Sequence, residues 1–150
     1  MRFASISRVA AAFLFGIFIS GAAQAADTPA TLTGTKVVSA EDVVKLQASG
    51  AAIIDTRVAS EYAEGHIKGA LSVPYREKSD KAVNFDASQD EFSLAKLPPA
   101  KDAAIVMYCN GPECWKSFKA STAAIKGGYT NLYWYRDGFP NWKSKGLAFE

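Results

Sequence analysis

Hydrophobic residues are arranged along the chain in two patterns, short continuous runs and longer stretches with helical spacing. The runs are rich in β-branched or aromatic side chains and end at turn-forming residues, so each predicts a buried strand. The predicted strands are 51–55, 71–74, 105–108 and 131–135, with a short edge strand at 37–38. Helices are predicted after the cap Ser39 up to Gly50, over 59–64 and over 115–126. Because strands alternate with helices, we expect an α/β fold with a mainly parallel sheet.

The first 25 residues carry a different pattern. A start containing Arg2 and Arg8 is followed by an apolar run over 9–19 and by Ala23-Gln24-Ala25. This is the arrangement of a cleaved secretory signal peptide, and the run has about half of the roughly 20 apolar residues that a membrane-spanning helix needs. We therefore expect a signal peptide over 1–25, a Gram-negative source, and a periplasmic protein without a membrane anchor after cleavage.

Removal of this leader changes the charge of the chain. The full sequence has 17 Lys and Arg against 15 Asp and Glu, and the two leader arginines account for the difference. The remainder has no net formal charge, and nothing suggests the clustered basic face of a nucleic-acid-binding protein. Its length suits one domain. We assign 26–38 to an N-terminal linker and 39–150 to that domain.

The predicted strand over 105–108 runs into Cys109, and the following loop enters the helix that begins at Trp115. Open parallel α/β sheets bind their ligands at the carboxyl ends of the strands. A thiol placed there faces loop N–H groups and the positive end of the next helix, which together favour a thiolate nucleophile. The alternative is a small buried apolar residue, as free cysteines often are. The stretch alone leaves both open.

Motifs on either side decide between these alternatives. Upstream come Asp55-Thr56-Arg57, Glu61-Tyr62, Gly65-His66-Ile67-Lys68-Gly69-Ala70 and Val73-Pro74. Downstream come Gly127-Gly128-Tyr129, Tyr133 to Tyr135, Asp137-Gly138-Phe139 and Trp142 to Gly146. In order and spacing, these motifs and the cysteine loop resemble those of the rhodanese domain family, from about Ser39 to Leu147.

That resemblance implies a fold, an activity and a site. The implied fold has three layers, with helices on both faces of a mainly parallel five-stranded sheet. The implied activity moves a sulfane sulfur from thiosulfate, polysulfide or a persulfide, through a persulfide on Cys109, to a thiol or cyanide, without a metal or organic cofactor. Loop N–H groups and the helix dipole are expected to bind the anion. The expected substrate-binding residues are Asn110, Gly111, Pro112, Glu113, Cys114, Trp115 and Arg57.

Two loop residues depart from the usual family pattern. Pro112 has no N–H to donate. Glu113 places a negative charge where thiosulfate-using members often carry Arg or Lys. Lys116 offers partial compensation, although a solvated lysine is the commoner case. We therefore expect polysulfide or a protein persulfide to be a better donor than a dianion such as thiosulfate.

Cys114 raises a separate question, because a cysteine pair in an oxidising compartment usually indicates a disulfide. A loop that curls around one sulfur tends to point its other side chains outward, so we expect both thiols to be free at rest. Cys114 is then either a resolving thiol that takes sulfur from Cys109 or seals it reversibly, or a residue packed beside Trp115. We place Trp115 at the pocket rim, where a partner protein could rest.

The upstream polar residues are expected to be structural. The resemblance implies that Asp55, Arg57 and Glu61 form a network beneath the site, with Arg57 nearest the substrate mouth. We do not expect His66, the single histidine, to be a general base. One histidine and two cysteines fall short of the usual metal ligand set. Aromatic residues between 133 and 142 are expected to pack in the core rather than stack on substrate.

The connection over 76–102 is the least informative part of the chain. It is charged, contains Pro98-Pro99 and has few apolar anchors. We expect a short helix around 90–96 and otherwise a covering loop, with a lid near the site as the alternative.

Three classes of function are compatible with a cysteine at this place in such a fold. A sulfurtransferase is favoured. Phosphatase or arsenate chemistry on this fold uses Cys followed by five residues and Arg, and position 115 is Trp, so that class is set aside. The alternative is a non-catalytic or redox-relay domain that docks to a partner in a periplasmic oxidation pathway. The loop ending Cys114-Trp115-Lys116-Ser117 resembles that of rhodanese-like proteins accompanying quinone-dependent oxidation in bacteria.

Overall fold

A computed structural model describes residues 26–150, so the expected signal peptide lies outside the described residues. Five parallel strands form one sheet in the order β1-β5-β4-β2-β3. They are β1 (Thr35–Val37), β2 (Ala52–Asp55), β3 (Leu71–Ser72), β4 (Ile105–Tyr108) and β5 (Leu132–Tyr135). Strand β4 occupies the centre, where Tyr108 lies opposite Asp55 on one side and Tyr135 on the other. The predicted five-stranded parallel sheet is confirmed.

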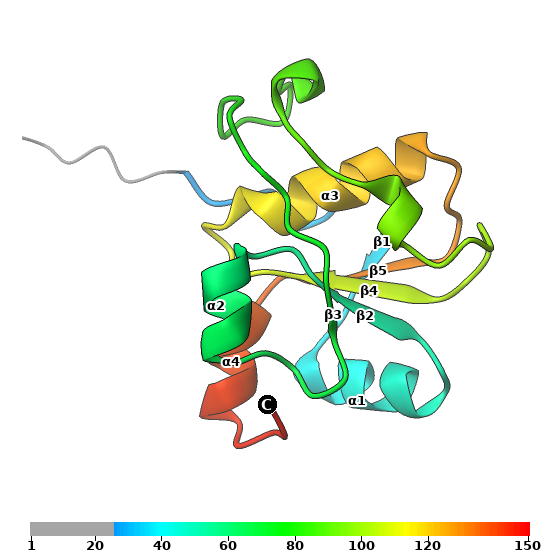
Figure 1. Cartoon of the computed structure of the whole chain (residues 1–150), viewed down its shortest axis with the longest axis vertical. Helices are drawn as coiled ribbons and strands as arrows, with labels where there is room; N and C mark the ends of the chain where they lie inside the picture. Colours follow the sequence, from blue (N-terminus) through cyan, green and yellow to red (C-terminus); the bar gives the residue numbers. More distant parts are fainter. Residues whose placement is uncertain (1–25) are drawn as a thin grey trace, which may run out of the picture.

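Helices cover both faces of this sheet, as Figure 1 shows. They are α1 (Ala40–Ala48), α2 (Ala59–Glu64), α3 (Trp115–Lys126) and α4 (Gly138–Ser144). Helix α3 lies on one face, and α1 and α4 lie on the other. Ser39 caps α1 as predicted and forms a capping box with Asp42, because the Ser39 hydroxyl accepts from the Asp42 N–H while the Asp42 carboxylate accepts from the Ser39 N–H.

Helix α4 was not predicted, because its sequence begins with residues that usually indicate a turn. Gly138 opens the helix and Pro140 follows two residues later. Proline is tolerated in the first turn of a helix, where its missing N–H has no intrahelical partner.

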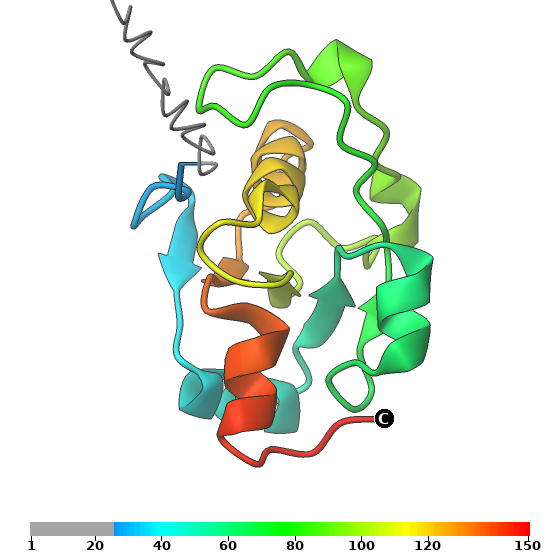
Figure 2. The same cartoon turned by 90° about the vertical axis from the view of Figure 1, so that its left-hand side faces the viewer.

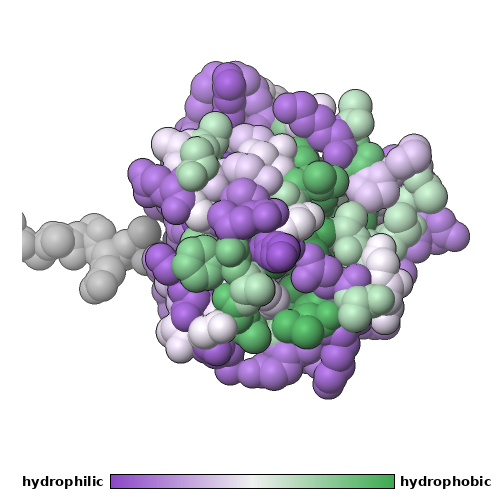
Figure 3. Space-filling model, turned by 60° about the horizontal axis from the view of Figure 1, so that its bottom comes forward, coloured by the Kyte–Doolittle hydropathy of each residue, from purple (hydrophilic) through white to green (hydrophobic). Residues whose placement is uncertain are grey.

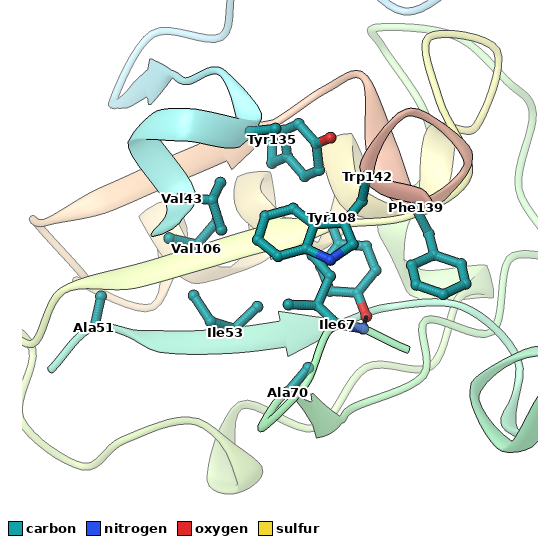
Figure 4. Close-up of a cluster of buried hydrophobic side chains, with 11 residues drawn as sticks. Val43, Ala51, Ile53, Ile67, Ala70, Val106, Tyr108, Tyr135, Phe139 and Trp142 are labelled. Carbon is teal, nitrogen blue, oxygen red and sulfur yellow. Dashed lines mark hydrogen bonds between the residues drawn. The ribbon is translucent and has the colours of Figure 1, made fainter. Parts of the chain in front are cut away.

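Side chains of the central strands alternate between two cores. Val106 and Tyr108 pack with α1 and α4, as Figure 4 shows, whereas Ile105 and Met107 pack with α3. All four residues of β4 are buried. Burial on both faces explains why this strand is a continuous apolar run.

The connection between β3 and β4 arches over α3 (Figure 1) and differs from the expectation. It contains two short 3₁₀ helices, η1 (Ala87–Gln89) and η2 (Leu94–Lys96), in place of the helix expected around 90–96. The Asp90 carboxylate accepts from the N–H groups of Lys78 and Ser79, each over 2.7 Å, and from the Tyr75 hydroxyl over 2.7 Å. These bonds hold the chain in a turned conformation that a continuous helix would not allow.

Lys119 of α3 fixes this connection in place. Its side chain is fully buried, and its Nζ lies 3.0 Å from the Glu77 carboxylate and 2.8 Å from the Ser79 hydroxyl. Charged residues are rarely buried unless they are paired. The connection is therefore anchored to α3 by a buried cation.

The surface on the side of α1 and the C-terminus carries hydrophobic side chains scattered among hydrophilic ones (Figure 3). Val44 and Phe149 are among the exposed hydrophobic residues. Within residues 26–150, no helix has both the length and the apolar character needed to cross a membrane.

Candidate active site

Cys109 lies where β4 ends, and the loop 110–114 leads from it into α3. Figure 2 looks onto this edge of the sheet, where the yellow loop crosses between α3 and α4 with α2 to one side. Side chains alternate along a strand, so Cys109 continues the face of Met107, toward α3. Cys109 is 1% exposed.

The two cysteines are joined by a disulfide bond, with Cα atoms 6.3 Å apart. The prediction that both thiols are free at rest is therefore wrong for this structure. The reason lies in the loop backbone, because the Cys114 N–H donates to the Gly111 carbonyl over 3.0 Å. Gly111 has a φ of +138°, which favours glycine. This turn brings Cys114 back onto Cys109 instead of pointing it outward.

Ser117, in the first turn of α3, contacts the sulfur of Cys109. The Ser117 Oγ lies 3.0 Å from Cys109 Sγ and 2.9 Å from Trp134 Nε1. An indole nitrogen only donates, so the Ser117 oxygen accepts from Trp134. A disulfide sulfur has no proton, so in its contact with Cys109 the Ser117 hydroxyl is the donor. Within residues 26–150 no backbone N–H donates to this sulfur, so the expected cradle of loop amides is absent from the disulfide form.

The importance of Ser117 was missed in the sequence, although a signal for its position exists. Four small residues with helical spacing are all buried against the sheet. They are Ser117, Ala120, Ser121 and Ala124. Small residues on one helix face permit a close approach, which places the first of them beside the end of β4.

The start of α4 supports the other side of the loop. The Phe139 N–H donates to the Cys109 carbonyl over 2.9 Å. Gly138 has a φ of +70°, and a Cβ added there would lie 2.5 Å from that same carbonyl oxygen and 2.6 Å from the Gly111 nitrogen. Only glycine allows the cysteine loop to pack so closely on α4.

A buried ion pair lies beneath the loop. Arg57 Nη2 is 2.6 Å from Asp55 Oδ2, and the same oxygen accepts from the Tyr108 hydroxyl over 2.6 Å. Burial alone would lower the pKa of Arg57, but the hydrogen bond and charge of Asp55 raise it overall. Burial, reinforced by the Asp55 charge, also raises the pKa of Tyr108. This chemistry holds Asp55 at the end of β2 against the end of β4.

Arg57 also binds the loop that follows α2. Its Nη2 donates to the Gly65 carbonyl over 2.7 Å, and its guanidinium lies 4.3 Å from the ring centroid of Phe139. Arg57 is 4% exposed, so it supports neighbouring loops and does not open onto a substrate mouth. Asp55 and Arg57 form the implied structural pair, whereas Glu61, the third expected member, accepts from the Val58 N–H and the Asn110 side chain instead.

Carboxylates lie against the loop from two directions. The Asn110 side-chain amide donates to the Glu61 carboxylate of α2. Glu113 is exposed, and its carboxylate folds over Gly111, where an added Cβ would meet Glu113 Oε2 at 3.1 Å. Two carboxylates, those of Glu61 and Glu113, therefore lie directly against the loop.

Residues 26–29, here called the N-terminal strap, cover the far side of the loop. The N–H and the hydroxyl of Thr28 lie 2.8 and 2.7 Å from the Pro112 carbonyl. The Arg136 guanidinium in turn donates to the Thr28 carbonyl over 2.6 Å. The segment expected as a linker thus contributes both this strap and β1.

Trp115 is buried beneath the strap instead of lying at a pocket rim. It is 3% exposed, and its Nε1 donates to the Ala26 carbonyl over 2.8 Å. Its ring also packs edge-on against Phe118. Trp115 therefore offers no open surface to a partner, which corrects the expectation.

His66 lies beside Glu150, the last residue of the sequence, and not beside the cysteines. Its Nδ1 is 2.9 Å from the Tyr62 carbonyl, and its Nε2 is 3.6 Å from the Glu150 carboxylate. The backbones of His66 and Glu150 also exchange two hydrogen bonds. The histidine motif thus anchors the C-terminus.

Two further observations concern metal binding and the position of a cavity. In the described part of the chain, no group of three or more His, Cys, Asp or Glu residues is placed to hold a metal ion. A cavity of about 630 Å³ lies along the β3–β4 connection, lined by Arg76, Glu91, Phe92 and neighbouring residues. None of its lining residues belongs to the cysteine loop.

The parallel sheet, with a cysteine where its central strand passes into a helix, defines a protein of the rhodanese class. The rhodanese-like domain model matches residues 39–145, and the chain belongs to that family.

Sulfurtransferases are among its relatives. Human thiosulfate:glutathione sulfurtransferase is 29% identical over 115 residues, which cover 76% of this chain and 98% of the relative. Thiosulfate sulfurtransferase GlpE of Pseudomonas entomophila is 28% identical over 109 residues, covering 73% of this chain and 85% of the relative. The structure of the human single-domain sulfurtransferase TSTD1 matches with a TM-score of 0.53 and 26% identity, over 74% of this chain and 97% of that chain.

Proposed function

We propose that this protein is a sulfurtransferase in which Cys109 accepts a sulfane sulfur, holds it as a persulfide, and passes it to a thiol or to cyanide. The observation that carries the proposal is the position of Cys109 at the end of β4, with its sulfur 3.0 Å from the Ser117 hydroxyl. A hydroxyl proton directed at sulfur stabilises a thiolate or persulfide anion.

The relatives support the chemistry. The human relative is named for thiosulfate and glutathione, and the Pseudomonas relative for thiosulfate. Small sulfur-containing anions as donors and small thiols as acceptors are therefore the substrates to test first. The reaction needs no metal or organic cofactor, because the persulfide forms on the protein itself.

The two carboxylates beside the loop favour a donor of low charge. The Glu113 carboxylate lies over Gly111, and Glu61 holds Asn110. Pro112 supplies no N–H to offset these charges. A protein persulfide, or a polysulfide in its singly protonated form, should therefore react faster than thiosulfate, a dianion. Glu113→Ala should raise turnover on thiosulfate, whereas Glu64→Ala, at an exposed residue of α2, should not; equal rates for the two variants would contradict the charge argument.

Cys109 becomes available only after the disulfide is reduced, which sets the design of the main experiment. Reduced protein, freed of reductant, is incubated with thiosulfate or with polysulfide and weighed intact. We expect a gain of one sulfur in Cys114→Ser, in which no disulfide can form, and none in Cys109→Ser. If no donor adds sulfur to Cys109, the proposal fails.

The disulfide also favours a second candidate, a redox-relay domain that exchanges electrons with a partner in a periplasmic oxidation pathway. Cyanolysis separates the two. A sulfur-loaded Cys109 releases thiocyanate when cyanide is added, and a pure dithiol relay does not.

We also propose a periplasmic location, on the signal-peptide pattern of residues 1–25. An oxidising compartment is where disulfides persist. N-terminal sequencing of the protein from a periplasmic extract should begin at Ala26. A protein that retains Met1 and fractionates with the cytosol would contradict this location.

A further inference from the structure

The bond between Cys109 and Cys114 joins the expected nucleophile to a residue that simple sulfur transfer does not require. We propose that Cys114 is a resolving cysteine, a catalytic residue that discharges the Cys109 persulfide and releases its sulfur as sulfide. This inference rests on the proposed function, because it requires a persulfide on Cys109.

In the resolving step, the Cys114 thiolate attacks Sγ of Cys109. The bond between that Sγ and the terminal sulfur breaks, and the Cys109–Cys114 bond forms. The terminal sulfur leaves with the bonding electron pair and takes up the proton lost from Cys114, so it departs as hydrosulfide. The sulfane sulfur gains two electrons and the two cysteines lose two, so no outside oxidant is required. The structure has the covalent connectivity of the product.

The fold holds the loop at two points, so this attack needs little rearrangement. The Phe139 N–H binds the Cys109 carbonyl over 2.9 Å, and the Thr28 N–H binds the Pro112 carbonyl over 2.8 Å. Between these anchors, the turn at Gly111 returns Cys114 to the sulfur of Cys109. A nucleophile held beside its target reacts as if it were highly concentrated.

The attacking sulfur of Cys114 and the attacked sulfur of Cys109 lie in different environments, as the resolving step requires. Cys114 is the N-cap residue of α3, where the helix dipole favours a thiolate. Cys109 Sγ, the sulfur under attack, is held by the Ser117 hydroxyl.

The disulfide must be reduced before another cycle begins. The different exposure of the two cysteines indicates which of their sulfurs the reductant attacks. Cys109 is 1% exposed, whereas Cys114 is half-buried. An external dithiol therefore attacks Cys114 Sγ, and Cys109 leaves as the thiolate beside Ser117. The second thiol of the external dithiol then attacks the mixed disulfide, which frees Cys114 and forms a disulfide within the external reductant. One cycle thus turns one sulfane sulfur and one dithiol into one sulfide and one disulfide, which makes the partner a dithiol reductant.

A single-turnover experiment with thiosulfate separates the two steps, because persulfide formation releases sulfite and resolution releases sulfide. Reduced full-length protein, freed of reductant, is mixed with excess thiosulfate. Sulfite, sulfide and intact mass are then followed in wild type, Cys114→Ser and Cys109→Ser. The sulfite released by Cys114→Ser also reports that this variant is folded.

We expect wild type to release sulfite and sulfide in equal amounts and to end as the disulfide. Cys114→Ser should release sulfite and keep one added sulfur on Cys109. It should form sulfide at a rate at least about tenfold below that of the wild type, because no neighbouring thiol displaces the added sulfur. Cys109→Ser should release neither product.

Two results would overturn the inference, and they differ. If wild type forms sulfite but keeps the added sulfur as stably as Cys114→Ser, the resolving role is wrong and the proposed function stands. If neither protein forms sulfite or gains sulfur, with thiosulfate or with glutathione persulfide, the proposed function fails and the inference fails with it.

Discussion

Trp134 donates a hydrogen bond of 2.9 Å from Nε1 to the Ser117 hydroxyl oxygen, and thereby directs the Ser117 proton at Cys109. The indole lies on β5 and the serine on α3, so the orientation of one hydroxyl depends on how the helix packs on the sheet. Hydrogen bonds to charged groups contribute about 1.5–3 kcal/mol. The stability of an anionic sulfur at Cys109 is therefore set by residues outside the cysteine loop.

Removing this hydroxyl should slow the chemistry of Cys109. In reduced protein carrying Cys114→Ser, so that one thiol remains, Ser117→Ala should lower the rate of alkylation by iodoacetamide at neutral pH about tenfold, since the thiolate loses its donor. Ser121→Ala is the matched control, because Ser121 is equally buried on α3 but contacts Met107. Equal rates for the two serine variants would show that the hydroxyl does not act on the sulfur.

Gly138→Ala should destabilise the protein and disturb the cysteine loop. A Cβ at Gly138 would lie 2.5 Å from the Cys109 carbonyl, in addition to the strain of a positive φ. Gly146→Ala is the matched control, because Gly146 has a φ of +68° and open space around it. We expect urea unfolding to give a loss of about 1–2 kcal/mol for Gly146→Ala and clearly more for Gly138→Ala. Similar losses would mean that the close packing of α4 on the loop is unimportant.

Asp90 should make the stability of the fold sensitive to acid. Burial opposes the charged form of Asp90, but hydrogen bonds from Ser79, Lys78 and Tyr75 outweigh it and lower its pKa far below the usual value. The folded state therefore binds fewer protons than the unfolded state near pH 4, so the free energy of unfolding falls as the pH drops below about 4.

Unfolding of the wild type and of Asp90→Asn should accordingly be compared between neutral pH and pH about 3. The variant should be less stable at neutral pH and should lose less stability on acidification. Asp80→Asn, on the same connection, makes none of the Asp90 contacts and should behave as wild type. Parallel pH profiles for wild type and Asp90→Asn would refute the assignment.

Lys119→Met should loosen the connection between β3 and β4. Without Lys119, the Glu77 and Asp90 carboxylates face each other without a cation, and breaking a buried pair costs about 3–5 kcal/mol. We expect faster limited proteolysis within 77–92 and a lower free energy of unfolding. Lys116→Met, on the same helix but partly exposed, should change neither; unchanged proteolysis of Lys119→Met would contradict the anchoring role.

Much of the fold could be predicted from the sequence, because local patterns and long-range packing agree there. The run over 105–108 is apolar throughout, and the structure buries it on both faces of the sheet. The helix over 115–126 begins and ends as its sequence indicates, with Gly127 after its last residue. For these elements, the spacing of hydrophobic residues is enough to predict the secondary structure.

The rest depends on contacts between distant residues, which spacing does not encode. A lysine in a helix usually faces solvent, and only the fold places Glu77 and Asp90 around Lys119. The pairing of Cys109 with Cys114 depends on a backbone turn at Gly111, so the side-chain directions in that loop could not be inferred in advance.

The N-terminal strap has a practical consequence for handling this protein. Ala26 accepts a hydrogen bond from Trp115, the residue directly after Cys114, so an affinity tag fused at Ala26 would be held beside the reactive disulfide. The opposite end is no safer, because Glu150 pairs with His66 through its backbone. Assays on recombinant material should therefore use protein with untagged ends, or place any tag beyond a cleavable spacer and remove it before the sulfur is counted.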